Sequence, residues 1–322
     1  MGLALIVHGG AGNIPEERHA TARAGCRAAA EAGWRVLLAG GSALDATQAA
    51  IMALEDDPSF NAGTGATLTA DGRAELDAGL MDGATLDVGA VAGVERVKNP
   101  IALARAVIAS PHVLLVGSGA ERFASESGIA LVEPALLITG AQRARWRQGY
   151  ADAEAQADAA LRGEQGGLDT GAGRPIPPNP HIHTDDDKHG TVGAVAIDAQ
   201  GHIAAGASTG GLAGKRPGRV GDTPLPGCGY IAEDGLGGVS STGHGEAFIR
   251  LTLARRALEY IASGMSAQQA AEAAIALLGG RVAGRGGLIL LDGQGQVGLA
   301  RNTPAMAYAY MLEGAAEIVA GV

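Results

Sequence analysis

The ten residues HGTVGAVAID at positions 189–198 determine how the rest of the chain is interpreted. They join a polar, proline-rich segment to apolar residues typical of a β-strand, and the Gly190–Thr191 bond lies at the junction. Gly190 has no side chain to block attack on its carbonyl carbon, and the Thr191 hydroxyl lies next to that carbonyl. If the bond were cut, Thr191 would carry a hydroxyl nucleophile and a free α-amine, whose pKa near ~8 suits it as the base. A Thr at the start of a strand is also an ordinary structural feature, so the remaining sequence has to decide between a catalytic and a purely structural Thr191.

The composition indicates a large globular protein with tightly packed elements. The chain has 322 residues, enough for one large domain or two smaller ones. Apolar residues make up 47% of it, aromatic residues only 3%, and there are 52 glycines. The core must therefore be built from Ala, Val, Leu and Ile, with many close backbone approaches.

Several classes of protein are disfavoured. The net charge is −10 and no basic patch is visible, which argues against a nucleic-acid partner. No apolar run reaches the length of a membrane span, and residues 1–7 are typical of a first strand and not of a signal peptide. Cys26 and Cys228 lie among small apolar residues, which favours two buried thiols over a disulfide. We therefore expect a cytoplasmic protein that binds neither nucleic acid nor membrane.

The first part of the chain alternates between helical and strand patterns. A helix is predicted from about Pro15 to Leu38, and Ser42 is expected to cap a second one. The Asp71-Gly72 pair predicts a hairpin between strands at 66–70 and 73–78. Three carboxylates at five-residue spacing fit neither a helix face nor a strand face, so we expect structural or capping roles for Asp77, Asp82 and Asp87.

Residues 163–189 form a predicted mobile linker rich in Gly, Pro, Asp and His. Its histidines and aspartates could bind a transition metal. A solvated tract is favoured, because ordering a flexible polar segment into a fixed site costs conformational entropy.

The pattern after the linker predicts a covered sheet. Strands are expected at 191–197 and 202–208, and both are apolar on both faces, so the sheet should be covered on both sides. A helix is predicted over 246–263, and the Ser266–Gln269 capping box should start another. A final hairpin is expected at 287–300. Helices covering a mainly antiparallel sheet follow from this order, which is an α+β fold.

Five motifs stand in order around this framework. They are HGGAG (8–12), FNAG (60–63), STGG (208–211), PGRVGDTP (217–224) and STGHGE (241–246). Together with the Gly-Thr-Val-Gly stretch, they resemble the plant-type L-asparaginase and isoaspartyl (β-aspartyl) aminopeptidase family of N-terminal-nucleophile hydrolases. The resemblance runs from the first strand to the last hairpin and omits only the linker.

The resemblance implies one domain over residues 1–322, a four-layer αββα sandwich of two stacked, mainly antiparallel sheets. It also implies self-cleavage between Gly190 and Thr191, which gives an α subunit of residues 1–190 and a β subunit of residues 191–322. Two such αβ units would form a heterotetramer, (αβ)2.

The resemblance also implies catalytic roles. Thr191 would attack the substrate carbonyl with its own amine as base. Thr209 would bond to the nucleophile, and Asn61 would help to seat it. The Thr242 hydroxyl and the Gly243 N–H would form the oxyanion hole.

Substrate-binding roles follow from the same resemblance. Arg219 would bind the substrate α-carboxylate and Asp222 the α-ammonium, while Gly243 and Gly245 let the backbone approach the ligand. Without the resemblance, Arg219 and Asp222 could simply form a surface ion pair three residues apart.

A sodium ion is the one cofactor that the resemblance implies, and its role would be structural. Backbone carbonyls of a loop would hold it, those of Leu54, Glu55, Asp57, Phe60, Ala62 and Thr64.

The implied activity is hydrolysis of β-aspartyl dipeptides and of the L-asparagine side-chain amide, with release of L-aspartate. The sequence does not rank these two small-molecule substrates. A glycosylasparaginase-like hydrolase is an alternative, although such relatives usually carry an export signal. A non-catalytic binding protein that uses the linker histidines is another, but it would leave the nucleophile and oxyanion residues without a role.

Overall fold

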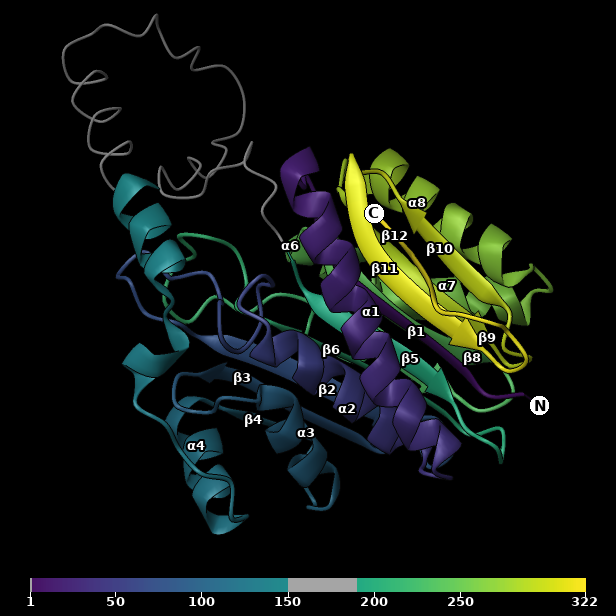
Figure 1. Ribbon diagram of the computed structural model, residues 1–322, viewed down its shortest axis with the longest axis horizontal. Helices are drawn as coiled ribbons and strands as arrows, with labels where there is room; N and C mark the ends of the chain where they lie inside the picture. Colours follow the sequence, from purple (N-terminus) through teal and green to yellow (C-terminus); the bar gives the residue numbers. More distant parts are fainter. Residues whose placement is uncertain (1, 150–189) are drawn as a thin grey trace, which may run out of the picture.

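The computed structural model describes residues 2–149 and 190–322, which form two stacked sheets between layers of helices (Figure 1). The predicted linker at 163–189 lies outside these residues. The larger sheet has the strand order β12-β11-β1-β5-β6-β2-β3-β4, and the smaller has the order β10-β9-β8-β7. Every pairing is antiparallel except β3 with β4, which is parallel.

The strands of the larger sheet come from both ends of the chain. They are β1 (Ala4–Gly12), β2 (Leu76–Asp82), β3 (Val88–Val94), β4 (Leu114–Val116), β5 (Val192–Ile197), β6 (Ile203–Thr209), β11 (Ala305–Leu312) and β12 (Val319–Gly321). The smaller sheet contains β7 (Tyr230–Glu233), β8 (Gly237–Gly243), β9 (Gly286–Asp292) and β10 (Val297–Arg301).

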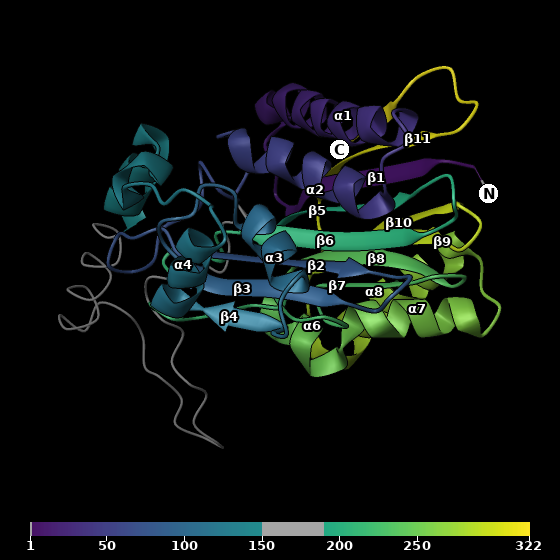
Figure 2. The same ribbon diagram turned by 90° about the horizontal axis from the view of Figure 1, so that it is seen from below.

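The helices cover the two outer faces. Those of the first part are α1 (Glu16–Leu38), α2 (Ala43–Asp56), α3 (Pro100–Ile108) and α4 (Gly117–Glu126), followed by the 3-10 turn η1 (Pro134–Leu137). Residues 140–149 are also helical. The second part has α6 (Gly245–Leu251), α7 (Leu253–Ala262) and α8 (Ala267–Val282). Figure 2 shows α1 and α2 on one side of the sheets and α7 and α8 on the other. This arrangement confirms the predicted αββα sandwich.

Successive side chains of the central strands point to opposite faces of the larger sheet and so contribute to two separate cores. Leu5 and Val7 of β1 pack against the helices α1 and α2, whereas Ile6 between them faces the smaller sheet. The same alternation separates Ala194 and Ala196 of β5 from Val195. The strands are buried on both faces, as their apolar sequences predicted.

Local signals located two helix starts correctly. The Ser42 side chain accepts a hydrogen bond from the Asp45 N–H, and the capping box of Ser266 and Gln269 is complete. The helix predicted over 246–263 is wrong as a single element, because Thr252 adopts a left-handed conformation with φ 47° and separates α6 from α7.

The hairpin predicted around Asp71-Gly72 is also wrong. The turn forms, with the Thr69 N–H donating to the Arg73 carbonyl at 2.8 Å, but residues 66–70 make no strand. The Ala70 N–H instead donates to the carbonyl of Lys215, 2.8 Å away, so a distant loop takes this segment's backbone bonds. β2 begins only at Leu76 and pairs with β3 and β6.

No helix in residues 2–149 and 190–322 combines the length and the hydropathy that crossing a bilayer requires. Both cysteines are buried and unpaired, as the sequence led us to expect.

Glycines let the two sheets approach closely, and Gly79 of β2 tests this. A Cβ atom at Gly79 would lie 2.2 Å from Cε1 of Tyr230, a fully buried ring in the smaller sheet. We expect Gly79→Ala to lower the free energy of unfolding by ~1–3 kcal/mol through overpacking, measured by urea titration. The matched control is Gly119→Ala in α4, where a Cβ meets open space. Equal stability of the two variants would contradict this account of the sheet packing.

Candidate active site

The Thr191 hydroxyl lies within hydrogen-bonding distance of a second threonine hydroxyl. Thr191 directly precedes β5 and is 7% exposed, and its Oγ1 donates to Thr209 Oγ1 at 3.2 Å. Thr209 ends β6, which runs antiparallel to β5 with Val192 opposite Ser208. The start of one strand therefore lies beside the end of the other, and the sheet brings together two hydroxyls that are 18 residues apart.

The Thr209 hydroxyl is oriented by the backbone that follows it. The Gly211 N–H donates to Thr209 Oγ1 at 2.9 Å. Asn61 fixes the same segment, because its Nδ2 donates to the Gly211 carbonyl at 2.7 Å and its own carbonyl accepts from the Gly210 N–H at 2.9 Å. Asn61 is thus placed at the site, where its hydrogen bonds go to the backbone of residues 210–211 and of Thr67 and not to Thr191.

Gly190 lies against Gly9, in the glycine-rich part of β1. A Cβ atom at Gly190 would lie 3.4 Å from the Gly9 carbonyl oxygen and 3.5 Å from the Asn61 Cβ. A cavity adjoins this point, lined by Gly9, Asn13, Arg18, Phe60, Asn61 and Gly190 among others. The cavity therefore adjoins the residue that directly precedes Thr191.

Strand β8 of the smaller sheet faces the start of β5. A Cβ atom at Gly193 would lie 2.0 Å from Ser240 Oγ, so these two residues are in direct contact across the sheets. Thr242 follows two residues after Ser240 and is fully buried, and its Oγ1 accepts from the Ala11 N–H at 3.2 Å. Since a hydroxyl has one proton as well as its lone pairs, Thr242 retains a proton to donate.

Gly243 continues this strand with a φ of 149°, and a Cβ there would lie 2.4 Å from the Arg285 carbonyl oxygen. Any other residue would clash with that backbone, so the sequence needs glycine beside Thr242. His8 lies nearby on β1, fully buried, with Nε2 3.0 Å from Ser240 Oγ. Burial lowers the pKa of His8 to about 3, which keeps the ring neutral.

The two charged residues assigned to substrate binding converge on Gly245. A Cβ atom at Gly245 would lie 2.9 Å from Asp222 Oδ1 and 3.0 Å from Arg219 Nη2. The surface ion pair considered as an alternative is not found, because Arg219 pairs with Glu246 through Nε–Oε1 at 2.9 Å and Nη2–Oε2 at 2.7 Å. Asp222 is only 3% exposed, and its Oδ2 has no hydrogen-bond partner among the described residues.

The buried carboxylate of Asp222, with one oxygen unpaired among the described residues, is suited to bind a cationic group. Burial raises the pKa of Asp222 to about 7, and the nearby Arg219 charge counteracts that rise. An ammonium group would supply the partner that Oδ2 lacks. The bidentate carboxylate that Arg219 now holds shows the geometry in which it can bind a carboxylate.

The loop assigned to a cation connects α2 to the site. The Glu55 side chain is fully buried and accepts from Ser208 Oγ at 2.6 Å and from the Ile101 N–H at 3.0 Å. Burial raises the pKa of Glu55 to about 8. Glu55 lies in the last turn of α2 and Ser208 directly precedes Thr209, so this carboxyl ties the end of α2 to the strand that ends at Thr209.

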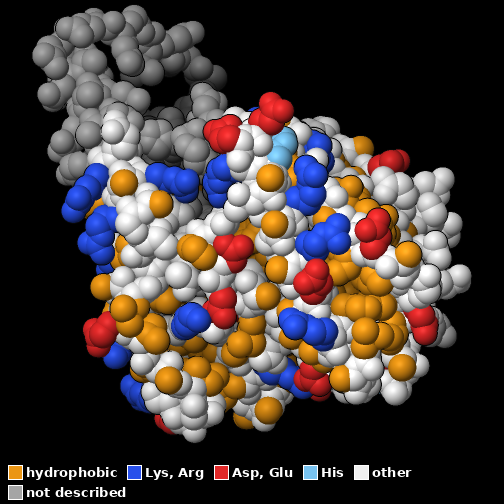
Figure 3. Space-filling view, in the orientation of Figure 1, with side chains coloured by type: hydrophobic (Ala, Val, Ile, Leu, Met, Phe, Trp, Pro, Cys, Tyr) orange, Lys and Arg blue, Asp and Glu red, His pale blue; other side chains and the backbone are white. Residues whose placement is uncertain are grey.

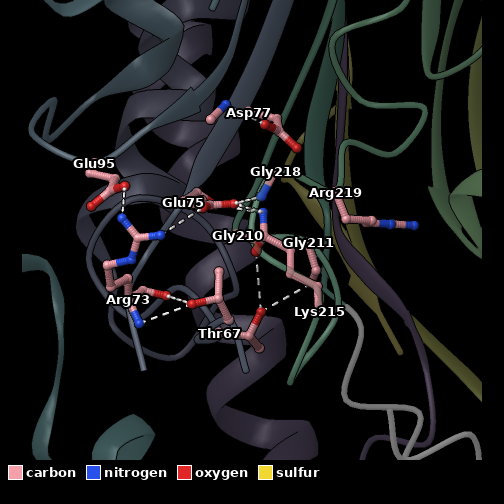
Figure 4. Close-up of polar contacts among 12 residues, drawn as sticks. Thr67, Arg73, Glu75, Asp77, Glu95, Gly210, Gly211, Lys215, Gly218 and Arg219 are labelled. Atoms are coloured by element: carbon pink, nitrogen blue, oxygen red, sulfur yellow. Dashed lines mark hydrogen bonds and ion pairs between the residues drawn. The ribbon is translucent and has the colours of Figure 1, made fainter. Parts of the chain in front are cut away.

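Sequence reasoning missed several polar residues beneath the site, which Figure 4 shows in part. Thr67 donates from Oγ1 to the Gly211 carbonyl at 3.0 Å, and Lys215 and Glu75 are buried behind the same segment. Glu246 belongs to a quoted motif but was given no role. No local pattern distinguishes these residues, because their partners lie far away in sequence.

The chain is similar to known proteins over nearly its whole length. A family model described as asparaginase matches residues 1–320. The plant-type L-asparaginase of Pyrococcus abyssi is 45% identical over 324 residues, covering 99% of this chain and 100% of that protein. The isoaspartyl peptidase/L-asparaginase of Danio rerio is 41% identical over 292 residues, covering 90% and 86%. The Bos taurus protein of the same description is 39% identical over 313 residues, covering 96% and 93%. The chain therefore belongs to the asparaginase family.

Proposed function

We propose that this protein is a self-processing threonine hydrolase that cleaves β-aspartyl dipeptides and the side-chain amide of L-asparagine, releasing L-aspartate. The observation that carries the proposal is the 3.2 Å hydrogen bond between the Thr191 and Thr209 hydroxyls. The buried Asp222 carboxylate, with one oxygen lacking a partner among the described residues, adds to it. Relatives named L-asparaginase and isoaspartyl peptidase support the substrate class.

The first step is cleavage of the chain itself. The Thr191 hydroxyl adds to the Gly190 carbonyl carbon, the C–N bond breaks, and the acyl group moves from nitrogen to oxygen. Water then hydrolyses the ester, which leaves a carboxylate on Gly190 and a free α-amine on Thr191. The α subunit would be residues 1–190 and the β subunit residues 191–322.

The freed amine then serves as the base for substrate hydrolysis. It accepts the Thr191 hydroxyl proton as the oxygen attacks the side-chain carbonyl of the substrate, and it returns that proton to the leaving amine. The Thr242 hydroxyl and the Gly243 N–H would stabilise the oxyanion. Water hydrolyses the acyl-enzyme and releases L-aspartate.

Two charged side chains would recognise the two oppositely charged groups of the amino-acid substrate. Asp222 would pair with the α-ammonium, and Arg219 would bind the α-carboxylate in the fork that Glu246 occupies in the uncut chain. Gly243 and Gly245 leave room for the ligand.

A monovalent cation is proposed for the loop at 54–64, held by the carbonyls named above, with sodium as the ion. A Cβ atom at Gly65 would lie 2.7 Å from the Pro58 carbonyl oxygen and 3.0 Å from that of Phe60, so two carbonyls converge there. The Glu55 carbonyl accepts from the Thr64 N–H at 2.8 Å and keeps one lone pair for a ligand. Oxygen ligands suit a hard cation. When bound, the ion would hold the loop that carries Asn61.

The proposed assembly is (αβ)2, and the proposed location is the cytoplasm. Membership of the asparaginase family supports the first, and the two buried free cysteines support the second. On the face shown in Figure 3, both basic and acidic side chains are present.

Replacing the nucleophile tests the proposed function. Thr191→Ala lacks the hydroxyl, so it should remain one full-length band on a denaturing gel and hydrolyse neither L-asparagine nor a β-aspartyl dipeptide. Thr191→Ser keeps a hydroxyl and should cut itself, more slowly than the wild type. Cleavage of Thr191→Ala at the same bond would show that another group performs the reaction.

Removing the carboxylate-binding fork tests the substrate assignment. Arg219→Ala should lower kcat/KM for L-asparagine roughly 100-fold, the scale of losing charge-assisted hydrogen bonds. β-Alanine amide has no α-carboxylate, so its slow turnover should be the same in both enzymes. The exposed Arg256→Ala is the matched control. Wild-type kcat/KM for L-asparagine in Arg219→Ala would rule out this role.

Cation exchange tests the proposed loop ion. Exhaustive replacement of sodium by tetramethylammonium, which is too large for a carbonyl cage, should lower both Tm and activity. Adding sodium back should restore both. Unchanged Tm and activity after the exchange would count against the cation.

A further inference from the structure

Lys215 is a buried charge that the proposed reaction does not use. Its side chain is 0% exposed, although transferring an ammonium from water to a protein interior is costly unless the charge is compensated. Nζ donates to the Glu75 carbonyl at 2.9 Å and lies 4.0 Å from Glu75 Oε2. The other two lysines, Lys98 and Lys188, belong to different parts of the chain.

Lys215, Glu75 and Asp77 form a buried cluster of charged groups, in which Glu75 contacts the ammonium (Figure 4). Glu75 is 5% exposed, and its Oε2 also accepts from the Gly218 N–H at 2.9 Å. Asp77 is fully buried and accepts from the Gly93 N–H at 2.8 Å. Burial raises the pKa of Asp77, and the Lys215 charge counteracts that rise. Its hydrogen bond from Gly93 gives Asp77 the structural role expected of it, while its Oδ2 has no hydrogen-bond partner among the described residues.

This cluster lies directly behind the paired hydroxyls. Asp77 is opposite Thr209 in the β2–β6 register. The Lys215 chain packs on Gly211, where a Cβ atom would lie 2.8 Å from Lys215 Cδ and 3.0 Å from Nζ. Gly211 has a φ of 80° and donates its N–H to Thr209 Oγ1. The ammonium is thus linked to Thr191 through one glycine and one threonine.

The same cluster fixes the loop that leads to Arg219. Glu75 binds Lys215 through its carbonyl and Gly218 through its carboxylate, so one residue holds both ends of the 215–218 segment. The loop has few apolar side chains of its own, and its position depends on these polar contacts.

We propose that Lys215 is a positioning residue of the active site: held by Glu75, it fixes Gly211 so that the Gly211 N–H keeps the Thr209 hydroxyl directed at Thr191. This inference rests on the proposed function, because it assumes that Thr191 is the nucleophile. It adds a residue that acts on the reaction without touching the substrate.

A double-mutant cycle with Thr209→Val tests this role on processed, folded enzyme. Lys215→Met keeps the length of the side chain and removes its charge. It should lower kcat for L-asparagine about tenfold and change KM less than threefold. In the Thr209→Val background, the same substitution should lower kcat less than twofold, because the hydroxyl that it positions is already gone. Lys98→Met, at an exposed lysine, should leave kcat unchanged.

Wild-type kcat in Lys215→Met, the same tenfold loss in both backgrounds, or wild-type kcat in Thr209→Val would overturn the proposal. If Lys215→Met does not fold, the double variant Lys215→Met/Asp77→Asn removes the cation together with one carboxylate charge. Compared with Asp77→Asn alone, it should lower kcat about tenfold when Thr209 is present and less than twofold in the Thr209→Val background. If neither folds, Lys215 serves the fold alone and the positioning role is rejected. An inactive wild type would instead contradict the proposed function.

Discussion

The antiparallel pairing of β5 with β6 is the constraint on which the site depends. It places the residue before one strand beside the last residue of the other, and so brings Thr191 and Thr209 within 3.2 Å. Both strands lie in the middle of the larger sheet, between β1 and β2. Close contact with β8, which glycine at 193 permits, brings Thr242 and Gly243 to the same end of the molecule. The hydroxyls are therefore held by buried backbone.

Buried charged side chains surround the backbone that holds these hydroxyls. Asp222, Asp77 and Lys215 are all fully or almost fully buried, and each has a pKa displaced mainly by burial. The Lys215 ammonium has a partner within the protein in Glu75, whereas Asp222, next to Arg219 and Gly245, has one oxygen without a partner among the described residues. The first arrangement suits a fixed scaffold, and the second suits a site that binds a cationic group from outside.

The sequence was sufficient to predict the features of the fold that depend on neighbouring residues. The Ser42 cap, the Ser266 capping box and the strands beside Thr191 each depend on residues a few positions apart, and all were predicted correctly. The failures have distant causes. Residues 66–70 are not a strand because Lys215 takes the backbone bond of Ala70. The partners Lys215 and Glu75 are 140 positions apart, and Arg219 and Glu246 are 27 apart, so no local pattern reveals either pair.

The central claim is that Thr191 becomes catalytic only when its amine is freed. The most direct measurement follows freshly purified full-length protein over time, with the cleaved fraction from intact mass and the rate of L-asparagine hydrolysis from the same samples. The rate should be proportional to the cleaved fraction and extrapolate to zero in the uncut chain, while the smaller fragment begins Thr-Val-Gly-Ala. A substantial rate at zero cleavage, or a different new N-terminus, would contradict this account.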